Sequence, residues 1–143
     1  MNYAINYQKT GDGFKATFPD FPEVLVLSDT ADQLESDAYD ALLTKLMMYM
    51  EAGQQIPLPQ AKGLATISLL PSISAKVLLH NLAIEQNKSR SWIASQMGVS
   101  RQVMTRLFNL RETTKVETIQ NALDGMGYEM RISIEPKPQN FQF

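Results

Sequence analysis

Residues 100–109 hold polar side chains of the types that read DNA bases. Arginine can donate two parallel hydrogen bonds to guanine, glutamine and asparagine can pair with adenine, and threonine can contact the thymine methyl group. On a helix through this stretch, the side chains left facing outward are those of Arg101, Gln102, Thr105, Arg106 and Asn109. Their types and spacing predict a surface that recognises base edges in the major groove.

A second group of residues is suited to the DNA backbone. Ser100 stands at the start of the same helix, and the neighbouring turns carry Ser89, Arg90, Arg111 and Lys115. Contacts from such side chains to phosphates would set the register of a protein on DNA without reading its sequence. The alternative for each of them is an ordinary solvated surface residue.

The stretch from 89 to 110 is patterned as two helices joined at a glycine. Gly98 can take the positive φ that ends a helix, and Ser100 is a preferred N-cap for the next one. The apolar and small residues expected between or beneath the helices are Trp92, Ile93, Ala94, Met97, Val99, Met104, Leu107 and Phe108. This spacing favours a helix-turn-helix over a helical hairpin that only packs.

Two further helices are expected around this pair. Ser72 is predicted to cap a helix through about Gln86, and Thr114 with Glu117 forms the pattern of a capping box before another helix, which Gly127 should end. The residues expected to face inward are Val77, Leu78, Leu82 and Ala83 in the first helix, and Val116, Ile119, Leu123 and Met126 in the second. His80, within the first helix, is expected to be a packed or surface residue.

Residues 128–134 alternate between apolar and polar types, which predicts a strand. Its partner could be the same strand of a second chain or the sheet of the front half. Because helix-turn-helix proteins commonly bind paired half-sites as dimers, the first arrangement is favoured, and a homodimer or higher oligomer is expected.

The front half of the chain predicts strands and one long helix. Residues 3–7 and 14–18 alternate with period two, residues 24–27 form a short apolar run, and residues 65–69 suit a last strand. Thr30 with Gln33 fits a capping box for a helix to about Glu51, before a proline-rich connection at about 53–64. The predicted fold is α+β: a βββα(β) domain over residues 1–70 and a small all-α domain with a terminal strand over 71–143.

Composition excludes several kinds of chemistry. The chain has no cysteine and one histidine, so disulfides and zinc clusters of thiolates or imidazoles are ruled out, and no cofactor is expected. Asp12, Asp20, Glu23 and Asp29 could in principle hold Mg²⁺, but their spacing suits solvated turns and strand ends, so an enzyme is not expected. Neither a membrane span nor a signal peptide is evident, which predicts a cytoplasmic protein without a membrane partner.

Charge is divided unequally along the chain. Residues 1–62 carry four lysines against nine acidic residues, a net charge of −5, whereas residues 63–143 carry nine basic and six acidic residues, a net charge of +3. An acidic front half and a basic back half predict two modules with oppositely charged partners.

Several short motifs, taken in order, resemble those of the HicB antitoxins in their longer form with a Cro/repressor-like domain. The matching stretches are GFKATFPDFP at 13–22, Asp29 with Thr30, IPLP at 56–59, AKV at 75–77 and MTRLFNL at 104–110. Glu23 departs from the pattern, which often has glycine after the second proline.

The resemblance implies a function in each half. The front domain would have a partial RNase H-like fold without nuclease activity and would block a small basic toxin of the HicA kind, an mRNA-cleaving ribonuclease. The back domain would bind operator DNA and repress the operon that encodes both proteins. The alternatives are a stand-alone helix-turn-helix repressor whose front domain senses a ligand, and an RNase H-like nuclease with a metal-binding carboxylate cluster.

Overall fold

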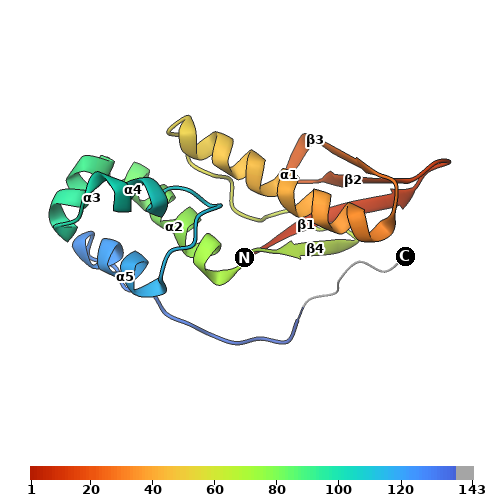
Figure 1. The fold of residues 1–143 in the computed structure, drawn as a ribbon. Helices are drawn as coiled ribbons and strands as arrows, with labels where there is room; N and C mark the ends of the chain where they lie inside the picture. Colours follow the sequence, from red (N-terminus) through yellow and green to blue (C-terminus); the bar gives the residue numbers. More distant parts are fainter. Residues whose placement is uncertain (138–143) are drawn as a thin grey trace. The chain divides into compact units, whose positions relative to one another are not determined.

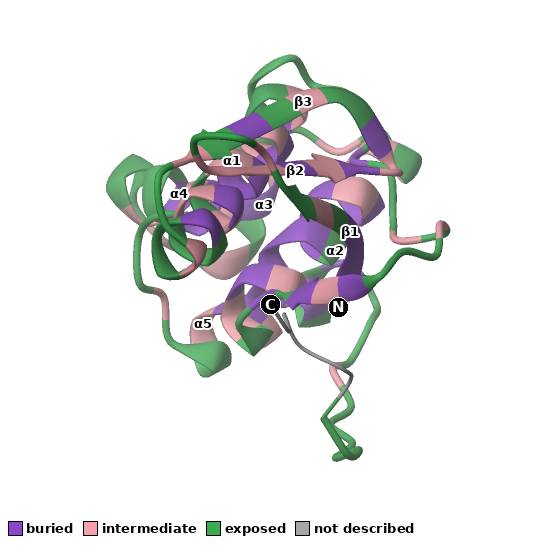
Figure 2. Ribbon diagram, turned by 90° about the vertical axis from the view of Figure 1, so that its right-hand side faces the viewer, coloured by how far each residue is buried: buried purple, intermediate pink, exposed green. Residues whose placement is uncertain are grey.

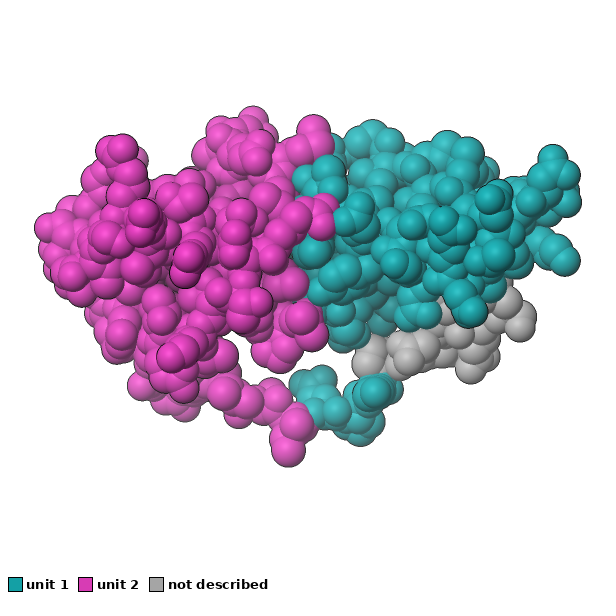
Figure 3. Space-filling view, viewed as in Figure 1, with its two compact units in different colours: residues 1–45, 57–69, 135–143 teal, residues 46–56, 70–134 magenta. Residues whose placement is uncertain are grey.

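The computed structural model describes residues 1–137, and its chain forms two compact units (Figure 3). Unit 1 comprises Met1–Lys45, Pro57–Leu69 and Glu135–Phe143. Unit 2 comprises Leu46–Ile56 and Leu70–Ile134. The chain therefore passes between the units more than once.

Unit 1 is built on a four-stranded antiparallel sheet with the order β3-β2-β1-β4 (Figure 1). The strands are β1 (Asn2–Lys9), β2 (Phe14–Phe18), β3 (Phe21–Ser28) and β4 (Ala65–Ser68). Period-two alternation sends Ala16 and Phe18 of β2 into the core, whereas Thr17 between them is only half-buried. The strands predicted at 3–7, 14–18, 24–27 and 65–69 are confirmed.

The long helix α1 (Ala31–Glu51) follows β3 directly. It begins after Thr30, whose hydroxyl accepts a hydrogen bond from the Gln33 amide at 3.2 Å, and the chain turns away at Gly53, where φ is +66°. Leu34, Ala38 and Leu42 of α1 are fully buried in the core of unit 1. The predicted helix and its capping threonine are confirmed.

The connection after α1 has no regular secondary structure over residues 54–63, yet side chains of the sheet hold it. The Tyr3 hydroxyl donates to the carbonyl of Pro57 at 2.6 Å, and the Asp20 carboxylate accepts from the Ala61 amide at 3.1 Å. The Asn6 side chain accepts from the Leu64 amide at 3.0 Å. The expected extended connection is therefore an ordered part of unit 1.

Unit 2 contains the helices α2 (Pro71–Glu85), α3 (Arg90–Met97), α4 (Arg101–Leu107) and α5 (Val116–Gly125). Helix α5 packs against both α2 and α3. The apolar residues of these helices that are at most 1% exposed form the centre of this core: Val77, Leu79, Ile93, Leu107, Ile119 and Ala122. Figure 2 shows α2 buried along most of its length, and eight of its residues are buried, whereas α3, α4 and α5 bury only one, two and three.

Two predicted helix caps are wrong. Helix α2 begins at Pro71 rather than after Ser72, because proline lacks the amide that a cap would satisfy and its φ is already helical. Helix α5 has Lys115 at its N-cap, while the Thr114 hydroxyl is buried without a hydrogen-bond partner. Leu78 and Val116, expected to face inward, are 47% and 39% exposed.

The strand predicted at 128–134 is not formed. Residues 128–137 have no regular secondary structure, and Ile132 and Ile134 are 84% and 99% exposed. A strand needs the backbone groups of a neighbour, and the sheet of the described residues accepts none from this segment. The preceding turn agrees with expectation, because Gly127 has φ of +81° and lies two residues after Gly125, the last residue of α5.

Gly13 gives a test of the packing between the β1–β2 turn and β3. A Cβ atom at Gly13 would lie 2.5 Å from the Ser28 carbonyl oxygen, whereas one at Gly11 would meet nothing within 4 Å. We expect Gly13→Ala to destabilise unit 1 by about 1–3 kcal/mol, because the backbone must move to relieve the clash. Gly11→Ala is the matched control and should change stability little. Amide hydrogen exchange in β1–β3 measures both, and equal protection in the two variants would contradict this packing.

Candidate nucleic-acid interface

Helices α3 and α4 are joined by a three-residue turn whose geometry is defined at each end. The Ser89 hydroxyl caps α3 by accepting from the Trp92 amide at 3.0 Å, and Gly98 ends that helix with φ of +66°. The Ser100 hydroxyl then accepts from the Val103 amide at 3.4 Å and starts α4. The predicted roles of Gly98 and Ser100 are confirmed.

Four of the five residues expected to face outward do so from α4. Arg101, Gln102, Thr105 and Arg106 are exposed. The Thr105 hydroxyl donates to the Arg101 carbonyl at 3.1 Å, which leaves the threonine methyl group as its free contact surface. These side chains form a polar surface along one short helix.

Asn109 is placed differently from the prediction. It lies beyond the end of α4 and is half-buried. Its side-chain oxygen accepts from the Arg111 amide at 3.0 Å, so this side chain stabilises the turn after the helix. The prediction that Asn109 faces outward from α4 is therefore wrong, because α4 ends at Leu107.

The residues predicted to contact phosphates lie in different parts of unit 2. Arg90, the first residue of α3, lies over the Phe108 ring with its guanidinium carbon 4.7 Å from the ring centroid, and burial lowers its pKa from the ordinary value. Arg111 and Lys115 are exposed in the connection between α4 and α5. A cavity of about 370 Å³ brings Arg90 together with Arg101 and Thr105.

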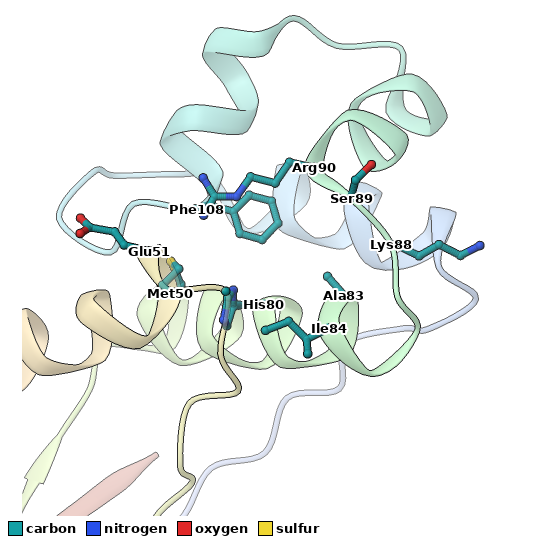
Figure 4. Close-up of a pocket in the computed structure, with 10 residues that line it drawn as sticks. Met50, Glu51, His80, Ala83, Ile84, Lys88, Ser89, Arg90 and Phe108 are labelled. Atoms are coloured by element: carbon teal, nitrogen blue, oxygen red, sulfur yellow. The ribbon is translucent and has the colours of Figure 1, made fainter.

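A second cavity of unit 2, of about 450 Å³, shares Arg90 with the first and is also lined by Phe108 and His80 (Figure 4). The His80 ring is 4% exposed and lies within hydrogen-bonding distance of the Gln54 carbonyl, with 2.7 Å between Nε2 and the oxygen. Burial lowers the pKa of His80, so the ring is neutral at neutral pH and Nε2 donates to that carbonyl. Of the two states that the sequence left open for His80, packed or at the surface, the structure shows the packed one.

The residue that sequence reasoning missed is Lys76, whose side chain is buried in unit 2 with 1% exposure. Its ammonium group donates to the carbonyls of Arg106, Asn109 and Glu112 at 2.9, 2.9 and 2.7 Å. A cation is stabilised at the carbonyl end of a helix, and these bonds satisfy a buried charge. The available signal was helical spacing, because Lys76 lies three residues after the buried Ile73 and three before Leu79.

Lys76 fixes the end of the polar surface on α4. Arg106, one of the outward residues, offers its backbone carbonyl to Lys76 while its side chain points to solvent. Burial lowers the pKa of the Lys76 ammonium, whereas the three carbonyls favour its charged form. The orientation of α4 therefore depends on a cation contributed by α2.

Two other kinds of site are absent from the described residues. Within residues 1–137, no three histidine or acidic side chains come together where they could hold a metal ion. Over the same residues, no helix is both long and apolar enough to cross a membrane.

Comparisons with known proteins match nearly the whole chain. Residues 2–78 match the family described as a HicB-like antitoxin of bacterial toxin–antitoxin systems. "Antitoxin HicB 1" of Photorhabdus laumondii is 33% identical over 136 residues, covering 94% of this chain and 88% of the relative. "Antitoxin HicB" of Escherichia coli is 34% identical over 135 residues, covering 92% of this chain and 98% of the relative.

Replacing Lys76 tests its role in unit 2. Lys76→Met keeps the length of the side chain but leaves three buried carbonyls without their donor, so we expect a loss of about 2–3 kcal/mol of stability. Lys115→Met, at an exposed position of the same unit, is the control and should be near neutral. Urea unfolding monitored on α4 amides by hydrogen exchange would distinguish them, and an unchanged Lys76→Met protein would refute the role.

Proposed function

This chain belongs to the HicB-like antitoxin family, and we propose that it is a non-enzymatic antitoxin that neutralises a HicA-like ribonuclease toxin and represses its own operon. The observation that carries the proposal is the extent of the match. Its relatives named as antitoxins cover 92–94% of the chain, so they include the residues of both units.

Toxin neutralisation is assigned to the front domain, residues 1–70, with its partial RNase H-like fold. A ribonuclease that binds RNA needs a basic substrate surface, and residues 1–62 carry a net charge of −5. An acidic antitoxin that covers this surface excludes RNA sterically and needs no chemistry of its own. Opposite charges speed association, while apolar contacts hold the complex together.

Operator binding is assigned to α3 and α4, acting as a helix-turn-helix. Arg101, Gln102, Thr105 and Arg106 lie on the exposed side of α4, where a recognition helix meets base edges. The proposed phosphate contacts are Ser100 at the start of α4, with Arg90, Arg111 and Lys115. The role proposed for Asn109 is to stabilise the turn at the edge of this interface, not to hydrogen-bond with adenine.

A homodimer would present two such helices to a palindromic operator. The exposed segment 128–134 has apolar side chains on alternate residues and no partner strand within the described chain. Pairing with the same segment of a second copy would satisfy its backbone groups and cover Ile132 and Ile134.

The antitoxin assignment predicts that a small basic ribonuclease is encoded next to this chain, and the experiment that tests the function is RNA cleavage by that protein. The full chain should abolish cleavage at a molar ratio near one, and a fragment of residues 1–70 should do the same if it folds. Full activity of the neighbouring protein in the presence of excess chain would refute the antitoxin assignment. A stand-alone repressor would then be the better account.

Two arginines should behave differently in DNA binding. We expect Arg106→Ala to cost about 1–3 kcal/mol of operator affinity and to relax the preference at one base pair. Arg111→Ala should lower the affinity for all DNA sequences alike and reduce the salt dependence of binding by about one counterion. Titrations of operator and single-base variants at several salt concentrations measure both effects. If Arg106→Ala instead lowered the affinity for all DNA sequences equally, that side chain would be a phosphate contact.

Ending the chain after Gly127 tests the proposed dimer. Without residues 128–143 the protein should become monomeric and bind a palindromic operator more weakly, because its two half-sites are no longer occupied together. Light scattering and DNA titration on the shortened and full chains provide the measurement. Unchanged mass and affinity would rule out pairing through this segment.

A further inference from the structure

Strand β3 exposes two large apolar side chains at the edge of the sheet. Leu25 and Leu27 are 57% and 66% exposed, while Val26 between them is 6% exposed and belongs to the core. Figure 2 shows exposed stretches of β3 that alternate with buried and intermediate ones. Burying an exposed leucine side chain is favourable by about 25 cal/mol of free energy for each Å² removed from water. Neighbouring exposed leucines therefore mark a contact surface.

The two edge strands of the sheet, β4 and β3, differ in length and in how far their apolar side chains are buried. Strand β4 has four residues, and its two apolar side chains, Ala65 and Ile67, are both buried. Strand β3 has eight residues, and no strand within residues 1–137 pairs along its outer side. Its free backbone groups can therefore accept another strand, whereas natural proteins usually shorten or cover such an edge.

The segment of the chain that contains this edge is rich in acidic residues. Residues 19–40, which contain β3 and the first half of α1, hold seven acidic residues and no lysine or arginine. The exposed members are Glu23, Asp29, Asp32, Glu35 and Asp40. Nearby cations are few: Lys45 pairs with Glu23 at 2.7 Å, and Lys15 lies beside Leu27 on β2.

We propose that the outer edge of β3, with Leu25 and Leu27, is the docking surface for the basic toxin, an inference that rests on the proposed antitoxin function. The acidic residues attract a basic partner, and the leucines and the free strand edge supply the contacts that hold it. A second copy of this chain would bring the same acidic residues face to face, and this repulsion disfavours it as the occupant.

The test replaces both leucines by threonine, which keeps the preference for a strand but removes most of the apolar surface. We expect Leu25→Thr with Leu27→Thr to raise the Kd for the toxin at least about tenfold, as for a central contact of an interface. Leu64→Thr is the matched control, because Leu64 is 60% exposed in the same unit, and it should bind as the unchanged chain does. Calorimetry with the purified neighbouring basic protein gives the Kd values, and hydrogen-exchange protection of the β1–β3 amides verifies that unit 1 of each variant is folded.

Each outcome has a separate meaning. If the unchanged chain does not bind the toxin, the proposed function fails. If the unchanged chain and the double variant bind it equally, the function stands and the docking surface on β3 is wrong. If the double variant instead lowers the oligomeric state of the chain measured without toxin, the edge is occupied by a second copy, which also overturns the proposal.

Discussion

The buried ammonium of Lys76 is the constraint on which the candidate DNA-binding surface depends. Helix α4 has seven residues, fewer than a helix needs to be stable by itself. Its end and the following turn are held by bonds from Lys76 to the carbonyls of Arg106, Asn109 and Glu112. A short helix can thus keep its outer face polar, because the anchoring is done through its backbone rather than by its exposed side chains.

In unit 1 the proposed binding surface does not depend on a buried charge. The stability of this unit comes from a large apolar core, and the proposed toxin surface is an exposed part of β3 outside that core. Tyr3 and Phe21 pack with ring centroids 5.5 Å apart within this core, and the Asp37 carboxylate accepts from the Ser28 hydroxyl to join α1 to β3. Leu25 and Leu27 take no part in it. The surface proposed to meet a toxin is therefore free to change without loss of the fold, whereas the surface proposed to meet DNA depends on a buried cation.

The elements were predictable wherever the signal is local. Alternation identified the strands, and the positions of Thr30, Gly98 and Ser100 marked helix ends, because caps and turns depend on neighbouring residues. Lys76 escaped prediction since its acceptors lie 30–36 residues away in the sequence. Ser72 and Thr114 failed as caps because Pro71 and Lys115 start those helices. The strand at 128–134 could not form in one chain, as its proposed partner belongs to another.

The central claim is that toxin neutralisation and DNA recognition reside in different parts of one chain. The most direct measurement is inhibition of toxin-catalysed RNA cleavage by the Arg106→Ala variant, titrated beside the unchanged chain. This account predicts superimposable inhibition curves, because Arg106 lies on α4 in unit 2 and the proposed toxin surface lies on β3 in unit 1. A loss of inhibition in proportion to the loss of operator affinity would contradict it.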